Sequence, residues 1–172
     1  MDALKKLSNY KDITNVPYIL FGALVIDLIG IALTKRGLLG LNMSIWYNDF
    51  GLSAVIADTL IIVLVIIAAQ YVYTEYFATS TPLIFLGLTA VFQQIHDVLF
   101  YLFAILGTPK GQNKVMDLFK AYAKENGSKI LLADLLMVLG TTGVAAAAQS
   151  LSQPLFVFLS ILAVYTVPYI IA

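Results

Sequence analysis

Apolar residues fill five long stretches of the chain, and polar residues gather between them. A helix needs about 20 mostly apolar residues to cross the hydrocarbon core of a bilayer. Its backbone groups must bond within the segment, because lipid offers them no partner. The pattern therefore predicts spanning helices at about 16–34, 52–74, 82–106, 128–149 and 154–171. The fifth stretch is the shortest and either spans or lies partly in the interface, so four or five transmembrane helices are expected.

The composition supports a multi-pass integral membrane protein. Of the 172 residues, 60% are hydrophobic and only 12% are charged, whereas a soluble domain carries about twice that charged fraction. We expect an all-α helical bundle forming one membrane domain over residues 1–172, with a polar N-terminal segment at 1–15. The chain has no cysteine, which excludes disulfides and thiolate metal sites. The formal charge of zero gives no reason to expect a nucleic acid as a partner.

The polar segment "GQNKVMDLFKAYAKEN" at 111–126 has the apolar spacing of an amphipathic helix. We expect it to lie on the membrane surface, although an ordinary solvated connecting helix fits the same pattern. Its basic residues and their neighbours are expected to dock an anionic lipid or a protein partner. These residues are Lys110, Lys114, Lys120, Lys124 and Lys129. Seven of the ten lysines and arginines lie in segments 35–51 and 107–129, so these segments are expected to face the cytoplasm.

Two segments resemble each other internally. "TKRGLLGLNMSIWYNDFGLSAVIAD" begins at Thr34 and "TPKGQNKVMDLFKAYAKENGSKILLAD" at Thr108, and each follows a span that carries an aspartate. The similarity predicts a helix, surface loop and helix used twice, in parallel orientation. The aromatic residues Trp46, Tyr47 and Phe50 of the first loop are expected to form an interfacial belt.

Four aspartates fall inside the predicted spans. Counting about 1.5 Å per helical residue, all four lie roughly 10–16 Å below the same face. A carboxylate facing lipid at mid-depth costs about 3 kcal/mol or more. We therefore expect these groups to point into the bundle, together with three polar residues of the third span. The resulting polar cluster comprises Asp27, Asp58, Gln93, Gln94, His96, Asp97 and Asp134.

Two functions for this cluster remain open from the sequence. The aspartates can fasten neighbouring helices through hydrogen bonds, or they can form a path for protons or cations. Catalysis is not expected, because the only histidine, His96, adjoins Asp97, and neighbouring positions on a helix do not face each other. No metal-binding or phosphate-binding motif is present, so no cofactor or metal is expected.

Three stretches carry a resemblance to a known group of proteins. "WYNDFGLSAVIAD", "QIHDVLFYLF" and "PKGQNKVMDLFKAYAKENGSKILLAD" are similar to small multi-span membrane proteins of large double-stranded DNA viruses of algae and protists. The resemblance implies a structural protein of the virion's internal membrane, or a membrane-anchored minor capsid component, and assigns no functional residue. The leading expectation is thus an integral membrane structural or assembly protein, which the resemblance would place in a virion or host membrane, with a homo-oligomer as one arrangement. The alternative is a proton- or cation-conducting channel or transporter.

Overall fold

The computed structural model describes residues 1–172 and is entirely helical, with 81% of residues in helices and no strand. The predicted all-α class is therefore confirmed. A short 3₁₀ helix at Ile13–Asn15 precedes the first long helix, and a π-helical turn at Phe100–Ile105 extends the third. The α-helices are α1 (Asp2–Leu7), α2 (Val16–Lys35), α3 (Leu41–Phe50), α4 (Leu52–Tyr76), α5 (Leu83–Leu99), α6 (Lys114–Asn126), α7 (Lys129–Ala148) and α8 (Gln153–Ile171).

Five of these segments are long and apolar enough to cross a membrane: α2 with its 3₁₀ start, α4, α5 with its π-turn, α7 and α8. Each agrees with a predicted span to within about two residues at either end, apart from the three residues that the 3₁₀ start adds. The 19 residues of α8 give a helix of about 28 Å. The fifth segment is therefore also long enough to cross the hydrocarbon core of a bilayer. The fold is compatible with a multi-pass integral membrane protein.

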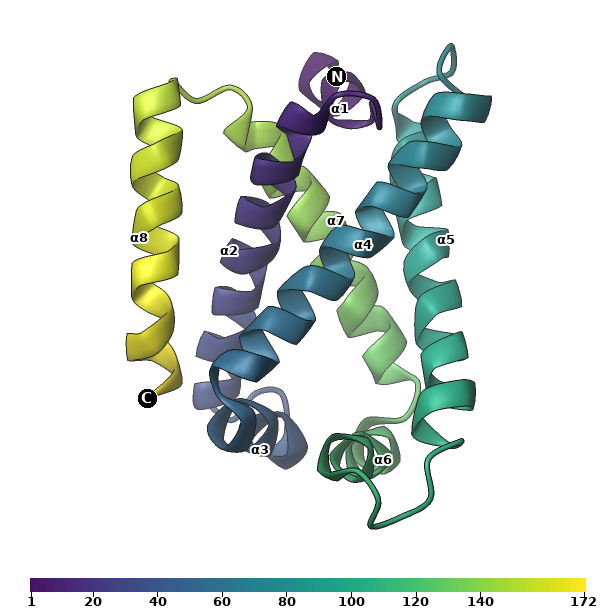
Figure 1. The fold of residues 1–172 in the computed structure, drawn as a ribbon, viewed down its shortest axis with the longest axis vertical. Coiled ribbons are helices and arrows are strands. Elements are labelled where there is room, and N and C mark those ends of the chain that lie inside the picture. The colour runs from purple at the N-terminus through teal and green to yellow at the C-terminus, as the bar shows by residue number, and fades with distance from the viewer.

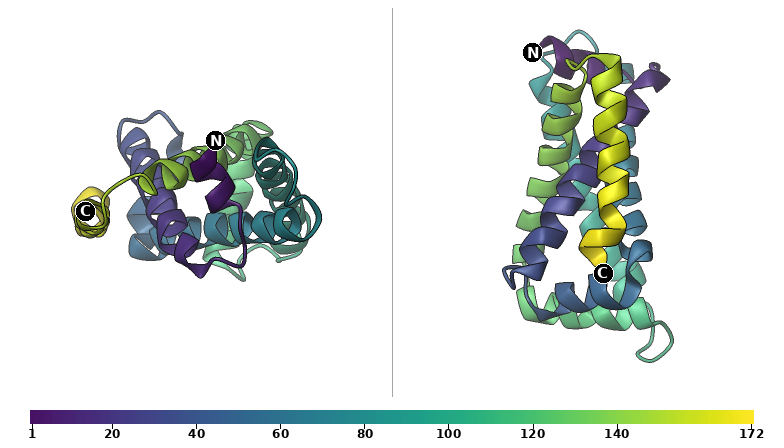
Figure 2. Two further views of the ribbon diagram at one scale, coloured as in Figure 1. Left: turned by 90° about the horizontal axis from the view of Figure 1, so that it is seen from above. Right: turned by 90° about the vertical axis from the view of Figure 1, so that its left-hand side faces the viewer.

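The long helices α2, α4, α5 and α7 pack into a bundle, and α8 stands at its edge against α2 (Figure 1). The short helix α1 closes one end of the bundle. At the other end α3 and α6 lie across the helix ends, almost perpendicular to the long axis (Figure 2). We call α3 and α6 together the platform.

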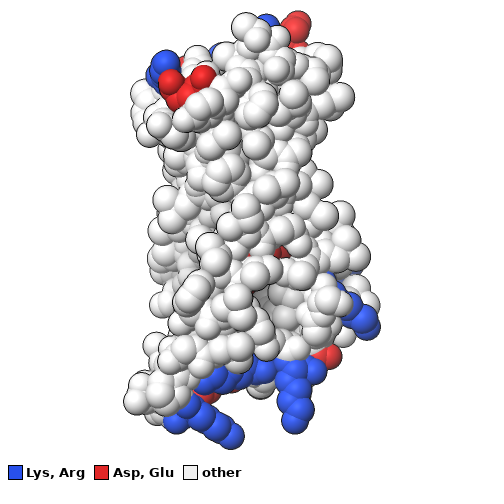
Figure 3. Space-filling model, turned by 90° about the vertical axis from the view of Figure 1, so that its right-hand side faces the viewer, with Lys and Arg blue, Asp and Glu red and all other residues white.

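Charged residues gather at the two ends of the molecule. On the face shown in Figure 3, lysine and arginine side chains crowd the platform end and fewer charges mark the α1 end. The belt between them is uncharged except for a small patch of acidic atoms. This distribution suits a protein that is surrounded by lipid at mid-height and by water at both ends.

The chain repeats one arrangement twice. In Figure 1, α2 runs toward the platform end and α4 runs back from it, and α5 and α7 do the same, with α3 and α6 as the connecting helices. The predicted parallel units are therefore present. The segment 35–51 was expected to be a loop, and this was wrong: Leu41–Phe50 is the helix α3. The internal repeat could have predicted this helix, since the segment that corresponds to α3 in the second unit, 111–126, was expected to be helical.

The centre of the bundle is apolar and closely packed. Ile19 and Ala23 of α2, Ile66 of α4 and Val138 of α7 are fully buried in one cluster. α2 and α7 approach so closely at Gly22 that a Cβ there would lie 2.6 Å from the carbonyl oxygen of Thr141. Small residues permit this approach, as expected for helices that associate inside a membrane.

Candidate functional site

Two of the four aspartates meet beneath the platform. Asp27 comes from α2 and Asp58 from α4, and the hydroxyl of Tyr47 on α3 lies between them. The hydroxyl oxygen is 2.8 Å from Asp27 Oδ1 and 3.0 Å from Asp58 Oδ2. The indole Nε1 of Trp46 donates a further hydrogen bond of 2.8 Å to Asp58 Oδ2. Two adjacent residues of a surface helix thus fasten two spanning helices.

The local sequence explains how α3 reaches this position. Gly40 and Gly51 flank the helix with φ angles of +88° and +50°. Glycine adopts this region without the steric penalty of a Cβ, so the chain turns sharply from α2 into α3 and from α3 into α4. The helix is thereby laid across the bundle end with its aromatic residues directed inward.

Trp46 and Tyr47 were expected to form part of an interfacial belt, and this was wrong. They are 4% and 2% exposed, because buried carboxyl groups below them accept their polar hydrogens. A tryptophan and a tyrosine next to each other, twelve and eleven residues before an aspartate in an apolar span, are the only sequence signal for these contacts. Because α3 was not predicted to be a helix, the spacing of these two aromatic residues from the aspartate did not reveal the contacts.

The third aspartate belongs to a separate group on α5. Gln93 Nε2 donates a 2.7 Å hydrogen bond to Asp97 Oδ1, and His96 Nδ1 lies 3.1 Å from the same oxygen. The expectation that His96 and Asp97 do not face each other was therefore wrong. The imidazole also stacks on Phe100, with 5.7 Å between the ring centroids.

Of the two remaining residues of the predicted cluster, Gln94 joins α5 to α7 by a hydrogen bond and Asp134 does not. Gln94 Nε2 donates a 3.0 Å hydrogen bond to the carbonyl oxygen of Leu131. Asp134 on α7 lies within electrostatic range of Asp97 and Asp58 but forms no hydrogen bond. The seven residues thus occupy one region, yet no hydrogen bond connects the Asp27–Tyr47–Asp58 group to the Gln93–His96–Asp97 group.

Glu125 ties the two platform helices together. Its carboxylate accepts hydrogen bonds from the amide nitrogens of Leu41 and Asn42, at 2.9 and 3.1 Å, and from Asn42 Nδ2 at 2.7 Å. A carboxylate at this position also suits the positive end of the α3 dipole. The glycine at position 40 permits the contact, since a Cβ there would lie 3.0 Å from Glu125 Oε1. Trp46 and Phe119 pack beside this tie with ring centroids 4.9 Å apart.

The platform tie is expected to loosen in acid. The hydrogen bonds from Asn42 and from the two backbone amides lower the pKa of Glu125 below its ordinary value of 4.5. A carboxyl group with a lowered folded-state pKa stabilises above its ordinary pKa and loses that contribution as the pH falls through the lowered one. The protection of the Leu41 and Asn42 amides against hydrogen exchange, relative to the intrinsic rate at each pH, should therefore be high at neutral pH and should fall as the pH drops below about 4.5.

Glu125→Gln is expected to give low protection of these amides at every pH, because the neutral amide accepts more weakly than the carboxylate. Asp49→Asn is the matched control, since Asp49 is exposed and makes no side-chain contact of this kind. An unchanged exchange rate in Glu125→Gln would contradict the capping role.

The predicted basic residues lie around α6. The helix begins at Lys114, after Asn113 Oδ1 has accepted hydrogen bonds from the amides of Val115 and Met116. Lys120 is turned back and donates to the carbonyl oxygen of Thr108. The other four side chains are exposed on the platform end: Lys110, Lys114, Lys124 and Lys129. Burial raises the pKa of Tyr122 on the inner face of α6 to about 12, with the Asp134 and Asp58 carboxyl groups adding to the effect.

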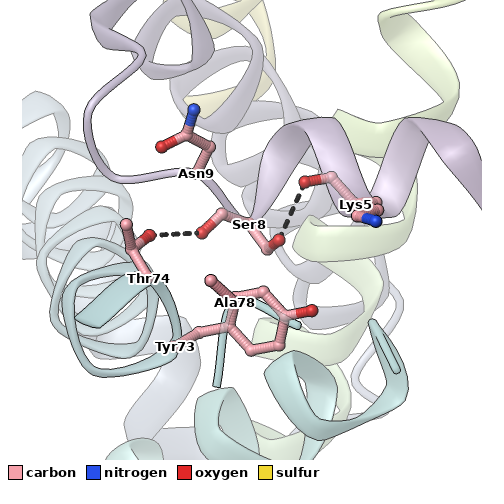
Figure 4. Close-up of a pocket in the computed structure, with 6 residues that line it drawn as sticks. All are labelled: Lys5, Ser8, Asn9, Tyr73, Thr74 and Ala78. Carbon is pink, nitrogen blue, oxygen red and sulfur yellow. Dashed lines mark hydrogen bonds between the residues drawn. The ribbon is translucent and has the colours of Figure 1, made fainter. Parts of the chain in front are cut away.

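The opposite end of the bundle has a cavity of about 280 Å³, formed where α1 meets α4 (Figure 4). Thr74 Oγ1 donates a 3.1 Å hydrogen bond to the carbonyl oxygen of Ser8, and Ser8 Oγ donates to that of Lys5. Gln70 Nε2 donates to the carbonyl oxygen of Leu7. Residues 1–15, expected only to be polar, therefore fold into a cap that is bonded to the bundle.

The fold and the site together define a small helical bundle whose interior acids hold a surface platform, an architecture compatible with a multi-pass membrane protein. Comparison with protein-family models, with curated proteins and with solved structures found no match to this chain. The resemblance to viral membrane proteins therefore stays a prediction from the sequence.

Proposed function

We propose that the protein is a membrane-embedded scaffold whose spanning helices anchor and orient the platform. The observation that carries this proposal is the use of Asp27 and Asp58. Both carboxyl groups form hydrogen bonds with side chains of α3, so the most unusual residues of the spans serve to hold a surface helix. The expected role in a virion membrane or capsid fits such a scaffold but rests on the sequence resemblance alone.

The packing above the aspartates supports the scaffold over a conduction path. Ile19 and Ile66 lie eight residues from Asp27 and Asp58 toward the α1 end, about 12 Å along the helices. Both are fully buried within the apolar cluster that also includes Val138 and Ala145. A proton or cation moving from the aspartates toward the α1 end would have to pass this buried apolar cluster.

The charge on the platform indicates which kind of lipid it binds. Four lysines are exposed around α6, and Lys35 and Arg36 are exposed at the end of α2. These side chains stand where the spans emerge from the apolar belt, which is the level of the lipid headgroups. Basic side chains at this level attract anionic lipids, each contributing about 1 kcal/mol. The platform is therefore proposed to gather anionic headgroups on the cytoplasmic side.

A conducting protein is the second candidate, favoured by buried carboxyl oxygens that lack a partner. Asp27 Oδ2 and Asp97 Oδ2 are of this kind. Proton and cation flux through liposomes holding the purified protein separates the two functions. The scaffold predicts no flux above protein-free liposomes, whereas flux that Asp97→Asn abolishes in folded protein would overturn it.

Anionic lipid selection is tested with matched lysine variants. In nanodiscs of mixed phosphatidylcholine and phosphatidylserine, the wild type is expected to retain phosphatidylserine preferentially after extraction, as counted by mass spectrometry. Lys114→Gln with Lys124→Gln should reduce this enrichment, because it removes two exposed charges from the platform. Lys5→Gln with Lys6→Gln, at the opposite end, should leave it unchanged. Equal losses in both double variants would show that the platform has no special part.

A further inference from the structure

The contacts of Tyr47 require one more hydrogen than the phenol supplies. Its oxygen lies within hydrogen-bond distance of two carboxyl oxygens, Asp27 Oδ1 and Asp58 Oδ2. A phenol carries one hydrogen, and an ionised carboxylate only accepts. Burial raises the pKa of Tyr47, so the phenol keeps its hydrogen. One hydrogen can fill one of the two contacts, and the other contact needs a hydrogen held by a carboxyl group.

Trp46 indicates which carboxyl group holds it. Asp58 Oδ2 already accepts from Trp46 Nε1, and two donors directed at one oxygen suit an ionised carboxylate. Tyr47 then donates to Asp58, and Asp27 donates to Tyr47. Asp27 is fully buried, and no lysine or arginine side chain contacts it. A charge at that position would lack a counter-ion, which is costly in an apolar interior.

We propose that Asp27, Tyr47 and Asp58 form a proton-binding site, and that the bound proton holds α3 against the bundle. The inference rests on hydrogen-bond geometry and stands whether or not the protein is a scaffold. In this arrangement the proton links α2, α3 and α4 through hydrogen bonds and is not transported.

The other titratable groups around the site do not replace this proton. Asp134 of α7 lies in electrostatic range of Asp58, with Asp97 of α5 next to it. On α6, Tyr122 lies in range of Asp58, and Glu125 is occupied at the start of α3. The nearest lysine on α2, Lys35, lines a cavity beside Tyr47, but its side chain is bonded to Asn48 and forms no ion pair with either aspartate. The groups in electrostatic range of Asp58 are acidic or neutral, so they favour a protonated group over a second negative charge.

A cavity gives water access to the site. It has a volume of about 220 Å³ at the junction of α2 and α3, and its lining includes Thr34, Ser44, Tyr47 and Asn48. Asn48 is exposed to solvent while Tyr47 is buried. The cavity therefore runs from the platform surface to the residue that bridges the two aspartates, and through it the proton can equilibrate with the solution on that side.

Loss of the proton should release the helix. Two negative oxygens would then face one phenol hydrogen, and the charge on Asp27 would add to that on Asp58. Separation of α3 from the bundle would let water reach both carboxylates. Because the bound form carries the proton, release is expected as the pH rises.

Trp46 reports this release directly, since it is the only tryptophan in the chain. In nanodiscs, between about pH 5 and about pH 9, its emission is expected to shift to longer wavelength as the pH increases. Asp27→Asn should abolish the shift, because the amide nitrogen donates to Tyr47 at every pH. Asp49→Asn, which changes an exposed aspartate of α3, should keep the shift of the wild type.

A second measurement detects the proton itself. The infrared spectrum of the wild type at neutral pH should contain the carbonyl stretch of a protonated carboxyl group, reduced in Asp27→Asn and unchanged in Asp49→Asn. The proposal fails if Asp27→Asn keeps the full emission shift, or if its infrared band equals that of the wild type. If Asp27→Asn does not fold, absence of the band or of the shift in the wild type alone would overturn the proposal.

Discussion

Gly22→Ala is expected to destabilise the protein by about 1–3 kcal/mol, although alanine is normally the better helix former. The new methyl group would lie 2.6 Å from the carbonyl oxygen of Thr141 and 3.1 Å from the amide nitrogen of Ala145. Both are backbone atoms of α7, so relief requires the two helices to separate. That separation would open the apolar cluster in which Ile19, Ala23 and Val138 are buried.

The same substitution on the partner helix provides the control. Gly143 lies on α7, and a Cβ there would meet no atom within 4 Å. Gly143→Ala is therefore expected to stabilise by about 0.5–1 kcal/mol, through the backbone entropy that glycine loses in a helix. Thermal unfolding in detergent micelles, followed by circular dichroism, compares the two variants. A loss of stability no greater in Gly22→Ala than in Gly143→Ala would disprove the close packing of α2 and α7.

Tyr47→Phe is the second change with a large expected effect, a loss of about 1–3 kcal/mol. The ring still fills its buried position, but the hydroxyl that joins Asp27 and Asp58 is gone. Two buried carboxyl groups then lose a hydrogen-bond partner, and the Trp46 bond to Asp58 is the one partly buried hydrogen bond left between α3 and the long helices. The emission of Trp46 should shift to longer wavelength at all pH values, because the helix is held less firmly.

Tyr122→Phe is the matched control on the other platform helix. Tyr122 is partly buried near Asp58 and Asp134, but its hydroxyl makes no hydrogen bond. Its removal should change stability by less than about 0.5 kcal/mol. Chemical unfolding monitored by Trp46 fluorescence measures both variants. Equal effects would mean that burial of an aromatic ring, and not the link between two aspartates, holds the platform.

The positions of the spans followed from the sequence because lipid imposes a simple rule. Every stretch of about 20 apolar residues became a helix, including α8, which ends at the last residue but one. The inward direction of Asp27 also followed, since a carboxyl group that faces lipid is costly, and Asp27 is fully buried. These features depend on composition and helical period, which are visible without knowing the partners of a residue.

The structure alone decided what the aspartates bind. The sequence placed Asp27, Asp58, Asp97 and Asp134 at one depth but could not divide them into groups. The division depends on α3, a helix of 10 residues that lies across the bundle end because Gly40 and Gly51 permit sharp turns. Once it lies there, Tyr47 reaches Asp27 across twenty residues of chain, a contact that no local pattern encodes.

Sequence by itself thus determined the all-helical class, the limits of the long helices, the helix α6 and the repeated arrangement of the two units. Tertiary structure decided which polar groups meet, that Glu125 caps α3, and that Lys120 turns back to the Thr108 carbonyl oxygen. The physical reason is the distance along the chain over which each interaction acts. Partition into lipid acts on each segment separately, whereas a buried hydrogen bond needs two segments to be brought within about 3 Å of each other.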